Sequence, residues 1–309
     1  MSNERELRIL QIVKGIDIGG YNGGSEHFGI RLARQLRQAG VDVSLCAYFR
    51  HNTSVEAEWA DCLKGEGIRL VFANRSYRLN LWEGYWSLAR FIKEHSVDLI
   101  HSHFQSGTLT SIFLKSMRNI DCIVRTAHTP LEFGTGWPGL IARNIFVNGI
   151  YPFVLDREIG VSRVLVNALD ARLSAHLAGK KAVCINNAVS EVVQTPQTIN
   201  PCIAFMEGLT EPPWIMTMIG ILNPLKNFDT VIRALPVILA DIPNARLALV
   251  GNGQEELWLR QLAIDLGVAD QVWFLGQRGD IATLLANSNL FIHPSLLEAL
   301  STVILEALQ

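Results

Sequence analysis

LFIHPSLLEALSTVILEALQ, at residues 290–309, is the stretch from which the fold of this chain is predicted. Its apolar start at 290–293 predicts a short strand, and the turn at 294–295 leads into an apolar segment with helical spacing. Glu298 and Glu306 are eight residues apart, so a helix rising about 1.5 Å per residue would separate them by about 12 Å. That span suits a ligand that combines a sugar, a diphosphate and a ribose. Two solvated helix glutamates are the alternative interpretation.

Two hydroxyl residues lie inside this predicted helix. Ser301 and Thr302 stand where an N-cap belongs, and an N-cap leaves backbone N–H groups free to meet a phosphate. The last twenty residues therefore predict one side of a nucleotide-sugar site, provided that the rest of the chain builds a sheet beside it.

Upstream of this stretch, short apolar strands alternate with helices in both halves of the chain, as in parallel α/β sheets covered on both faces. Residues 194–213 break the alternation with Pro-rich and Thr-rich sequence and are predicted to be a linker. We therefore predict a first domain at 1–193 and a second at 214–309, two Rossmann-like sheets facing a cleft, with ligands at the carboxyl ends of the strands. The predicted strands are 8–14, 41–48, 68–72, 99–102, 122–126, 158–161, 182–185, 214–219, 246–250 and 272–275, and the predicted helices are 25–38, 55–64, 81–94, 107–117, 163–173, 228–239, 255–266 and 281–286.

Composition excludes several classes of protein. The chain has 309 residues, 49% hydrophobic and 18% charged, with a net charge of −2, which predicts a globular protein with no electrostatic footprint for nucleic acid. Five cysteines without a C-x-x-C pair predict buried free thiols in a reducing compartment. The first residues lack the layout of a signal peptide, so we expect a cytoplasmic protein. The apolar region 137–155 is predicted to be a helix packed on the first domain, and contact with a membrane surface is the alternative.

Two glycine-rich turns follow predicted strands. Gly23 and Gly24 close a run of four glycines before the first helix, where positive φ angles and a close backbone approach to a ligand become accessible. The run lacks the lysine of a Walker loop and misses the G-x-G-x-x-G spacing, so a flexible connection is the alternative. Asn252 lies between two glycines in a similar but weaker turn.

Histidines and one lysine complete the candidates. His101, His103 and His128 fall at or just beyond strand ends. The first two are expected to be hydrogen-bonded structural residues, and His128 a polar contact in the cleft. A three-histidine metal site lacks a supporting carboxylate and is not expected. Lys226 follows the turn that starts at Gly220 and is placed for a phosphate, although an exposed surface lysine is the alternative.

Together these motifs resemble the retaining GT-B glycosyltransferases of glycosyltransferase family 4. The resemblance rests on the strand–G-x-L-x-x-x-K turn at 220–226, on the E-x7-E pair that ends at Glu306, on His-Ser-His at 101–103 and on Thr-Ala-His at 126–128. It implies an enzyme that moves a hexosyl unit from a UDP- or GDP-sugar to a hydroxyl acceptor, such as a glycan or a lipid-linked glycan, in cell-envelope or polysaccharide synthesis. No essential metal is expected, because protein cations and helix dipoles would stabilise the leaving group.

The same resemblance implies roles for single residues. Gly23 and Gly24 would lie beside the donor diphosphate, and His128 would contact the transferred sugar. Lys226 would hold the diphosphate. Glu298 would bind sugar hydroxyls, and Glu306 would bind the ribose.

Three departures from the family pattern affect these expectations. Ile221 stands where the family usually has an arginine, and Ala188 and Ala299 replace common glycines. The resemblance also implies further βα units beyond Gln309, so the chain is expected to be a truncated or frameshifted form with an incomplete second domain. A degenerate protein that binds a nucleotide sugar without turnover is the alternative function, and a GT-B sugar-nucleotide epimerase is a third.

Overall fold

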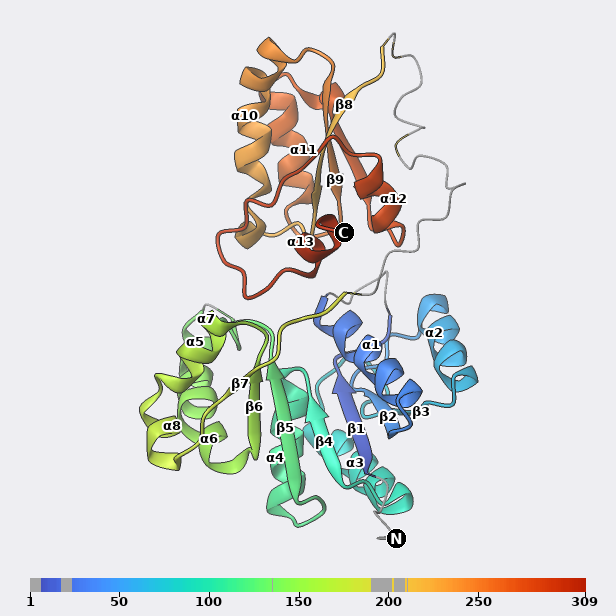
Figure 1. Cartoon of the computed structure of the whole chain (residues 1–309), viewed down its shortest axis with the longest axis vertical. Coiled ribbons are helices and arrows are strands. Elements are labelled where there is room, and N and C mark those ends of the chain that lie inside the picture. Colours follow the sequence, from blue (N-terminus) through green and yellow to red (C-terminus); the bar gives the residue numbers. More distant parts are fainter. Residues whose placement is uncertain (1–6, 18–23, 135, 190–201, 203–208, 210) are drawn as a thin grey trace. The chain divides into compact units, whose positions relative to one another are not determined.

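The computed structural model describes residues 7–17, 24–134, 136–189, 202, 209 and 211–309 (Figure 1). The chain divides into two compact units, Met1–Asn187 and Ala188–Gln309. Each unit has its own sheet and its own hydrophobic cores.

In the described part of the first unit, seven strands form one parallel sheet in the order β3-β2-β1-β4-β5-β6-β7. The all-parallel pairing confirms the predicted α/β class. The strands are β1 (Arg8–Val13), β2 (Asp42–Ala47), β3 (Arg69–Phe72), β4 (Leu99–Ser102), β5 (Cys122–Ala127), β6 (Arg157–Gly160) and β7 (Val183–Cys184).

Helices cover both faces of this sheet because successive strand residues point to opposite faces. In β1, Leu10 and Ile12 belong to one core, while Ile9 and Val13 belong to the other. The helices that connect the strands are α1 (Gly24–Gln38), α2 (Ser54–Gly65), α3 (Leu81–His95), α4 (Gln105–Ser116), α5 (Trp137–Ile145), α6 (Tyr151–Val154), α7 (Arg163–Asp170) and α8 (Leu173–Ala178), with the π-helical turn η1 (Phe146–Ile150) between α5 and α6 (Figure 1).

The second unit repeats this design on a smaller sheet. Four strands of its described residues are parallel, in the order β10-β9-β8-β11. Met216 and Met218 of β8 face the core under α10 and α11, while Ile215 and Ile219 face the core under α12. The elements are β8 (Trp214–Ile219), η2 (Pro224–Lys226), α10 (Phe228–Asp241), β9 (Ala245–Val250), α11 (Glu256–Asp265), η3 (Ala269–Gln271), β10 (Val272–Gly276), α12 (Ile281–Ala286), β11 (Leu290–Phe291) and α13 (Thr302–Ala307).

The predicted linker at 194–213 lies mostly outside the described residues. Within it, Cys202 is buried in the core that also contains Ile215 and Trp273, and Leu209 packs against the same core. These two described residues of the predicted linker therefore belong to the second unit.

The prediction of one helix carrying both Glu298 and Glu306 is wrong. Residues 292–301 form an irregular segment, and α13 begins at Thr302 and ends at Ala307. The apolar pattern was misleading because Leu296 and Leu297 are 69% and 38% exposed, so no core holds a helix there. The backbone instead bonds to another loop, since the Leu296 N–H donates to the Leu225 carbonyl at 2.8 Å.

Two further expectations are settled by the described residues. All five cysteines are free thiols, as predicted, but only Cys46 and Cys202 are buried, because Cys122 and Cys184 are half-buried and Cys62 is exposed. Within the described segments, no helix combines the length and the apolar character needed to cross a membrane.

Candidate functional site

The carboxyl edge of the second sheet carries tightly packed glycine turns. Gly251 follows β9 with φ +134°, and a Cβ there would lie 1.9 Å from the Gly220 carbonyl oxygen. A Cβ on Gly253 would lie 2.1 Å from the Leu222 carbonyl oxygen. The Leu222 N–H donates to the Asn252 carbonyl at 3.0 Å. The loops after β8 and β9 are thus in backbone contact, which only glycine permits at these positions.

Lys226 and Glu298 meet at this edge although 72 residues separate them. The Lys226 ammonium donates to Glu298 Oε2 at 2.5 Å. His293 Nε2 lies 3.2 Å from the same oxygen, and Ser295 Oγ lies 3.2 Å from His293 Nε2. The Lys226 stem runs beside Gly220, where an added Cβ would lie 3.6 Å from its Cδ and Cε.

The surroundings of Glu298 favour its charged form. Burial opposes ionisation, but the hydrogen bonds from His293 and Lys226 outweigh it and lower the pKa of Glu298 to about 2. Glu298 is therefore a carboxylate at neutral pH, and its side chain remains about one-third exposed. It can accept further hydrogen bonds from a ligand hydroxyl.

The loop geometry around Lys226 is set by asparagines. Asn223 caps the η2 turn by accepting from the Lys226 N–H at 3.2 Å. Asn227 adopts a left-handed conformation at φ 58°, and its side-chain amide donates to the Pro294 carbonyl at 3.3 Å. This second hydrogen bond joins the β8 loop to the β11 loop next to Lys226.

The remaining predicted residues of the second unit lie at α13. Ser301 is the buried N-cap residue of this short helix, but its hydroxyl makes no capping hydrogen bond. Thr302 is the first helical residue, and Glu306 lies on the last turn and is half-buried. The structure thus separates Glu298, in the loop, from Glu306, in the helix.

At the carboxyl edge of the first sheet, buried polar side chains form a second cluster. His103 Nε2 lies 2.6 Å from Gln11 Oε1, and His103 Nδ1 lies 3.2 Å from His128 Nε2. His101 Nε2 lies 2.8 Å from the Thr126 hydroxyl, and the rings of His101 and His103 are 4.3 Å apart. The prediction that His101 and His103 are hydrogen-bonded is confirmed.

Burial keeps these histidines neutral. Desolvation lowers the pKa of His101 and of His128 to about 4, and it lowers the pKa of His103 well below its ordinary value. Within the described residues, no group of three or more His, Cys, Asp or Glu side chains is arranged to hold a metal ion.

The glycine-rich loop is described only at its end. Gly23 lies outside the described residues, and Gly24 is the exposed first residue of α1. One turn later, Phe28 packs edge-on against the rings of His103 and His128, at centroid distances of 5.8 and 5.3 Å. The start of α1 and His128 therefore lie at the same edge of the first sheet.

A buried ion network supports the loop that follows His128. The Arg125 guanidinium donates to both oxygens of Glu132 at 2.8 Å and to Glu158 at 3.0 Å. Arg172 also pairs with Glu158, and the guanidinium of Arg125 lies 4.6 Å from the centroid of the Tyr151 ring. Paired charges of this kind fix backbone positions, because breaking one pair strands a buried charge.

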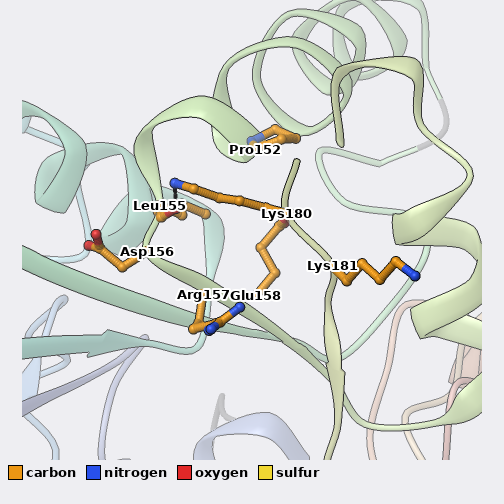
Figure 2. A pocket seen from close by; sticks show the side chains of 7 residues that line it. All are labelled: Pro152, Leu155, Asp156, Arg157, Glu158, Lys180 and Lys181. Carbon is orange, nitrogen blue, oxygen red and sulfur yellow. Dashed lines mark hydrogen bonds between the residues drawn. The ribbon is translucent and has the colours of Figure 1, made fainter. Parts of the chain in front are cut away.

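A pocket at the amino end of β6 lies away from these predicted residues (Figure 2). Lys180 reaches across it to donate to the Leu155 carbonyl at 2.6 Å, while Lys181 points away. None of the residues that line the pocket is a predicted site residue. The lining consists of Pro152, Leu155, Asp156, Arg157, Glu158, Lys180 and Lys181.

Sequence reasoning missed several members of the two clusters. His293 gave a usable signal because it directly follows the apolar residues 290–292, and Gln11 gave one because it interrupts an apolar strand. Asn227 and Ser295 gave none, since their contacts depend on how two distant loops meet.

Comparison with known proteins decides the family. Residues 22–193 match the family described as Glycosyltransferase Family 4, and residues 203–309 match the family described as Glycosyl transferases group 1. The chain belongs to glycosyltransferase family 4. The predicted family is confirmed over nearly the whole sequence.

Curated relatives agree with this family. The chain is 34% identical over 296 residues to the lipopolysaccharide core biosynthesis glycosyltransferase LpsE of Rhizobium meliloti (strain 1021), covering 93% of this chain and 74% of LpsE. It is 24% identical over 233 residues to the UDP-Gal:alpha-D-GlcNAc-diphosphoundecaprenol alpha-1,3-galactosyltransferase of Escherichia coli. That match covers 72% of this chain but only 58% of the length of the Escherichia coli protein.

Solved structures agree with the fold. The Anabaena HepE protein in complex with UDP and glucose matches 98% of this family 4 chain and 78% of its own, with a TM-score of 0.74 at 21% identity. WaaG, a glycosyltransferase involved in lipopolysaccharide biosynthesis, matches 97% of this chain and 78% of its own, with a TM-score of 0.64 at 16% identity. The fold of the two Rossmann-like units is therefore GT-B, as predicted.

Proposed function

We propose that this family 4 chain transfers a hexosyl unit from a nucleotide diphosphate sugar to a hydroxyl acceptor, with retention of anomeric configuration. The observation that carries the proposal is the pairing of Lys226 with ionised Glu298 at the carboxyl edge of the second sheet. A cation and a carboxylate held side by side match a donor whose diphosphate and sugar hydroxyls are adjacent. The UDP and glucose bound by HepE support the same class of donor.

In this proposal, Lys226 holds the diphosphate and Glu298 accepts hydrogen bonds from the sugar. The bond from the anomeric carbon to the diphosphate oxygen breaks, and a bond from the same carbon to the acceptor oxygen forms on the same face. The departing diphosphate oxygen takes the acceptor proton, so no separate protein base is required. Glu306 binds the ribose, and Ser301 and Thr302 border the phosphates.

We also propose that the reaction needs no metal, because Lys226 and backbone dipoles supply the positive charge. Transfer in the presence of excess EDTA should then match transfer without it. A requirement for a divalent cation would contradict this part of the proposal.

Donor binding can be tested directly on the chain. UDP, GDP and their sugars should give saturable ligand-observed NMR signals and should raise the melting temperature at millimolar concentration. Lys226→Ala and Glu306→Ala should weaken binding at least tenfold, as expected for lost charge-assisted contacts. Lys181→Ala, at an exposed lysine of the first unit, is the matched control. No response to any nucleotide would overturn the proposal.

For the acceptor, we propose a lipid-linked or membrane-proximal glycan. The supporting observation is α5, which has no buried residue and exposes Trp137, Ile141 and Ile145 (81%, 56% and 50%) at successive helical turns. An apolar helical stripe with an interfacial tryptophan suits the boundary of a lipid bilayer. The names of LpsE and of the Escherichia coli relative support an acceptor of this class.

Vesicle flotation tests the membrane contact. The chain should float with vesicles that contain anionic phospholipid, and the double variant Trp137→Ala/Ile141→Ala should lose most of this binding. Trp82→Ala, at an exposed tryptophan of α3, should float like the unsubstituted chain. If the α5 variant and the α3 control float equally well, α5 is not the contact.

A second candidate is a protein that binds a nucleotide sugar without turnover. It is favoured by Ile221, which is 53% exposed in the β8 loop where the resemblance implies an arginine. Binding by NMR without release of nucleoside diphosphate in any donor and acceptor combination would favour this candidate over the transferase.

A further inference from the structure

Three side chains at the carboxyl edge of the first sheet form a continuous hydrogen-bonded network that ends at His128. Gln11 lies on β1, His103 follows β4, and His128 follows β5. The two contacts are Gln11 Oε1 to His103 Nε2 at 2.6 Å and His103 Nδ1 to His128 Nε2 at 3.2 Å. We propose that Gln11 is a positioning residue that fixes the tautomer of His128 through His103. Its consequence for the sugar rests on the proposed function.

The direction of each hydrogen bond in this network follows from which atoms can donate and which can only accept. An amide oxygen only accepts, so His103 Nε2 carries the hydrogen that it donates to Gln11. A neutral imidazole then has a lone pair at Nδ1, and His103 Nδ1 accepts from His128 Nε2–H. His128, neutral in turn, has its own lone pair at Nδ1. The orientation of the Gln11 amide thus determines the tautomer of both the His103 ring and the His128 ring.

The surroundings hold the rings in this arrangement. Gln11 and His103 are buried, and Phe28 packs edge-on against both His103 and His128. An added Cβ on Gly29 of α1 would lie 3.3 Å from His103 Cδ2, so the helix leaves little room for this ring to rotate. Gln11 Nε2 has no hydrogen-bond partner among the described residues, and turning the amide over would reverse both hydrogen bonds, so the tautomer of His128 follows the orientation of this one amide.

The lone pair on His128 selects the kind of group that it can bind. A nitrogen without hydrogen accepts from a hydroxyl, but it repels a phosphate oxygen, which has only lone pairs to offer. Among the described residues, His128 Nδ1 has no hydrogen-bond partner. His128 is therefore suited to a sugar hydroxyl and unsuited to the diphosphate, whatever the identity of the sugar.

The tautomer can be measured without any substrate. Long-range ¹H–¹⁵N correlation spectra of the histidine-labelled full chain distinguish a protonated from an unprotonated ring nitrogen, and His128→Gln assigns the signal. His128 should be protonated at Nε2 and unprotonated at Nδ1. In Gln11→Leu, or in Gln11→Met if the first variant does not fold, this pattern should become mixed or reversed. Thr126→Val removes the contact of Thr126 with His101, which is not part of the Gln11–His103–His128 network, and should leave the tautomer of His128 unchanged.

Two results would overturn the proposal: Nδ1–H as the main tautomer of His128 in the unsubstituted chain, or an unchanged tautomer in a folded Gln11 variant. If a donor sugar is found, Gln11→Leu should raise its KM about tenfold, the effect of one lost hydrogen bond, with less change in kcat. Failure of nucleotide binding would defeat the proposed function but would leave the tautomer result standing, so the two ideas fail separately.

Discussion

Glu298 is the residue of the second unit that contacts both Lys226 and His293. Its carboxylate accepts from Lys226 and lies within hydrogen-bond distance of His293, and these contacts lower its pKa to about 2 despite the opposing effect of burial. The same carboxylate thus joins the loop after β8 to the loop after β11 and remains available to a ligand. One side chain has both a structural and a proposed binding role.

The stability due to Glu298 depends on pH. Because the folded pKa lies below the ordinary value of 4.5, its contribution is complete above about pH 4.5 and is lost as the pH falls toward about 2. Glu298→Gln should lower the unfolding free energy by about 0.5–1 kcal/mol at pH 7, since solvent screens this partly exposed pair. Melting curves of both proteins between pH 7 and pH 3 should converge. A difference in melting temperature that widens at low pH would contradict the lowered pKa of Glu298. Glu211→Gln, at an exposed glutamate, is the control.

Ile221 gives a prediction about rate. Its side chain is 53% exposed in the loop that also carries Lys226, so an arginine fits there without a clash. If the leaving diphosphate is short of one positive charge, Ile221→Arg should raise turnover by about 10²–10³-fold, the typical effect of one preorganised electrostatic contact. Initial rates with the best donor measure this, with Ile221→Gln as the uncharged control. Equal rates for both variants would show that the missing charge is not limiting.

Between β5 and α8, the buried ion network links elements that the strands alone would not fix. Arg125 on β5 holds Glu132 in the loop after His128 and Glu158 on β6, while Arg172 at the start of α8 shares Glu158. The network therefore ties the loop that begins at His128 to two neighbouring strands.

Removing the centre of this network should be costly. Arg125→Met should lower the unfolding free energy by about 3–5 kcal/mol, because it strands a buried glutamate. The double variant Arg125→Met/Glu132→Leu should recover most of the loss, since an apolar pair replaces the ion pair. Urea unfolding measures both. The partly exposed pair of Arg69 with Asp42 offers the control Arg69→Met, expected to cost about 0–1 kcal/mol. Equal losses for Arg125→Met and Arg69→Met would refute this account.

The whole chain contains separate hydrophobic cores for its two units. Leu88 and its neighbours belong to the first unit, and Leu259 and its neighbours to the second, with no core cluster of the described residues drawing on both. Stability should therefore be divided between the units rather than shared by the chain as one block.

Substitutions in the two cores should have separate effects. Leu259→Ala should destabilise the second unit by about 2–5 kcal/mol and speed its amide hydrogen exchange, while the first unit keeps its protection. Leu88→Ala should do the reverse, and because both leucines are fully buried the pair is matched. Faster exchange in both units after either substitution would mean that they unfold together.

The sequence by itself determined the alternation of strands and helices, because the spacing of apolar residues is a local property that survives in the folded sheets. It also singled out Lys226, Glu298 and His128, since a cation, an acid and a polar ring at predicted strand ends or beside a glycine turn are visible in the order of residues. It misjudged residues 296–301, where an apolar pattern predicted a helix that the structure replaces with a loop.

Only the tertiary structure decided which of these residues meet. The strand order β10-β9-β8-β11 sets β8 beside β11, and this adjacency brings Lys226 to Glu298 across 72 residues. The placement of β1 beside β4 likewise brings Gln11 to His103 across 92 residues. Such pairs depend on how parallel strands are ordered, and the local periodicity of a chain carries no information about that order.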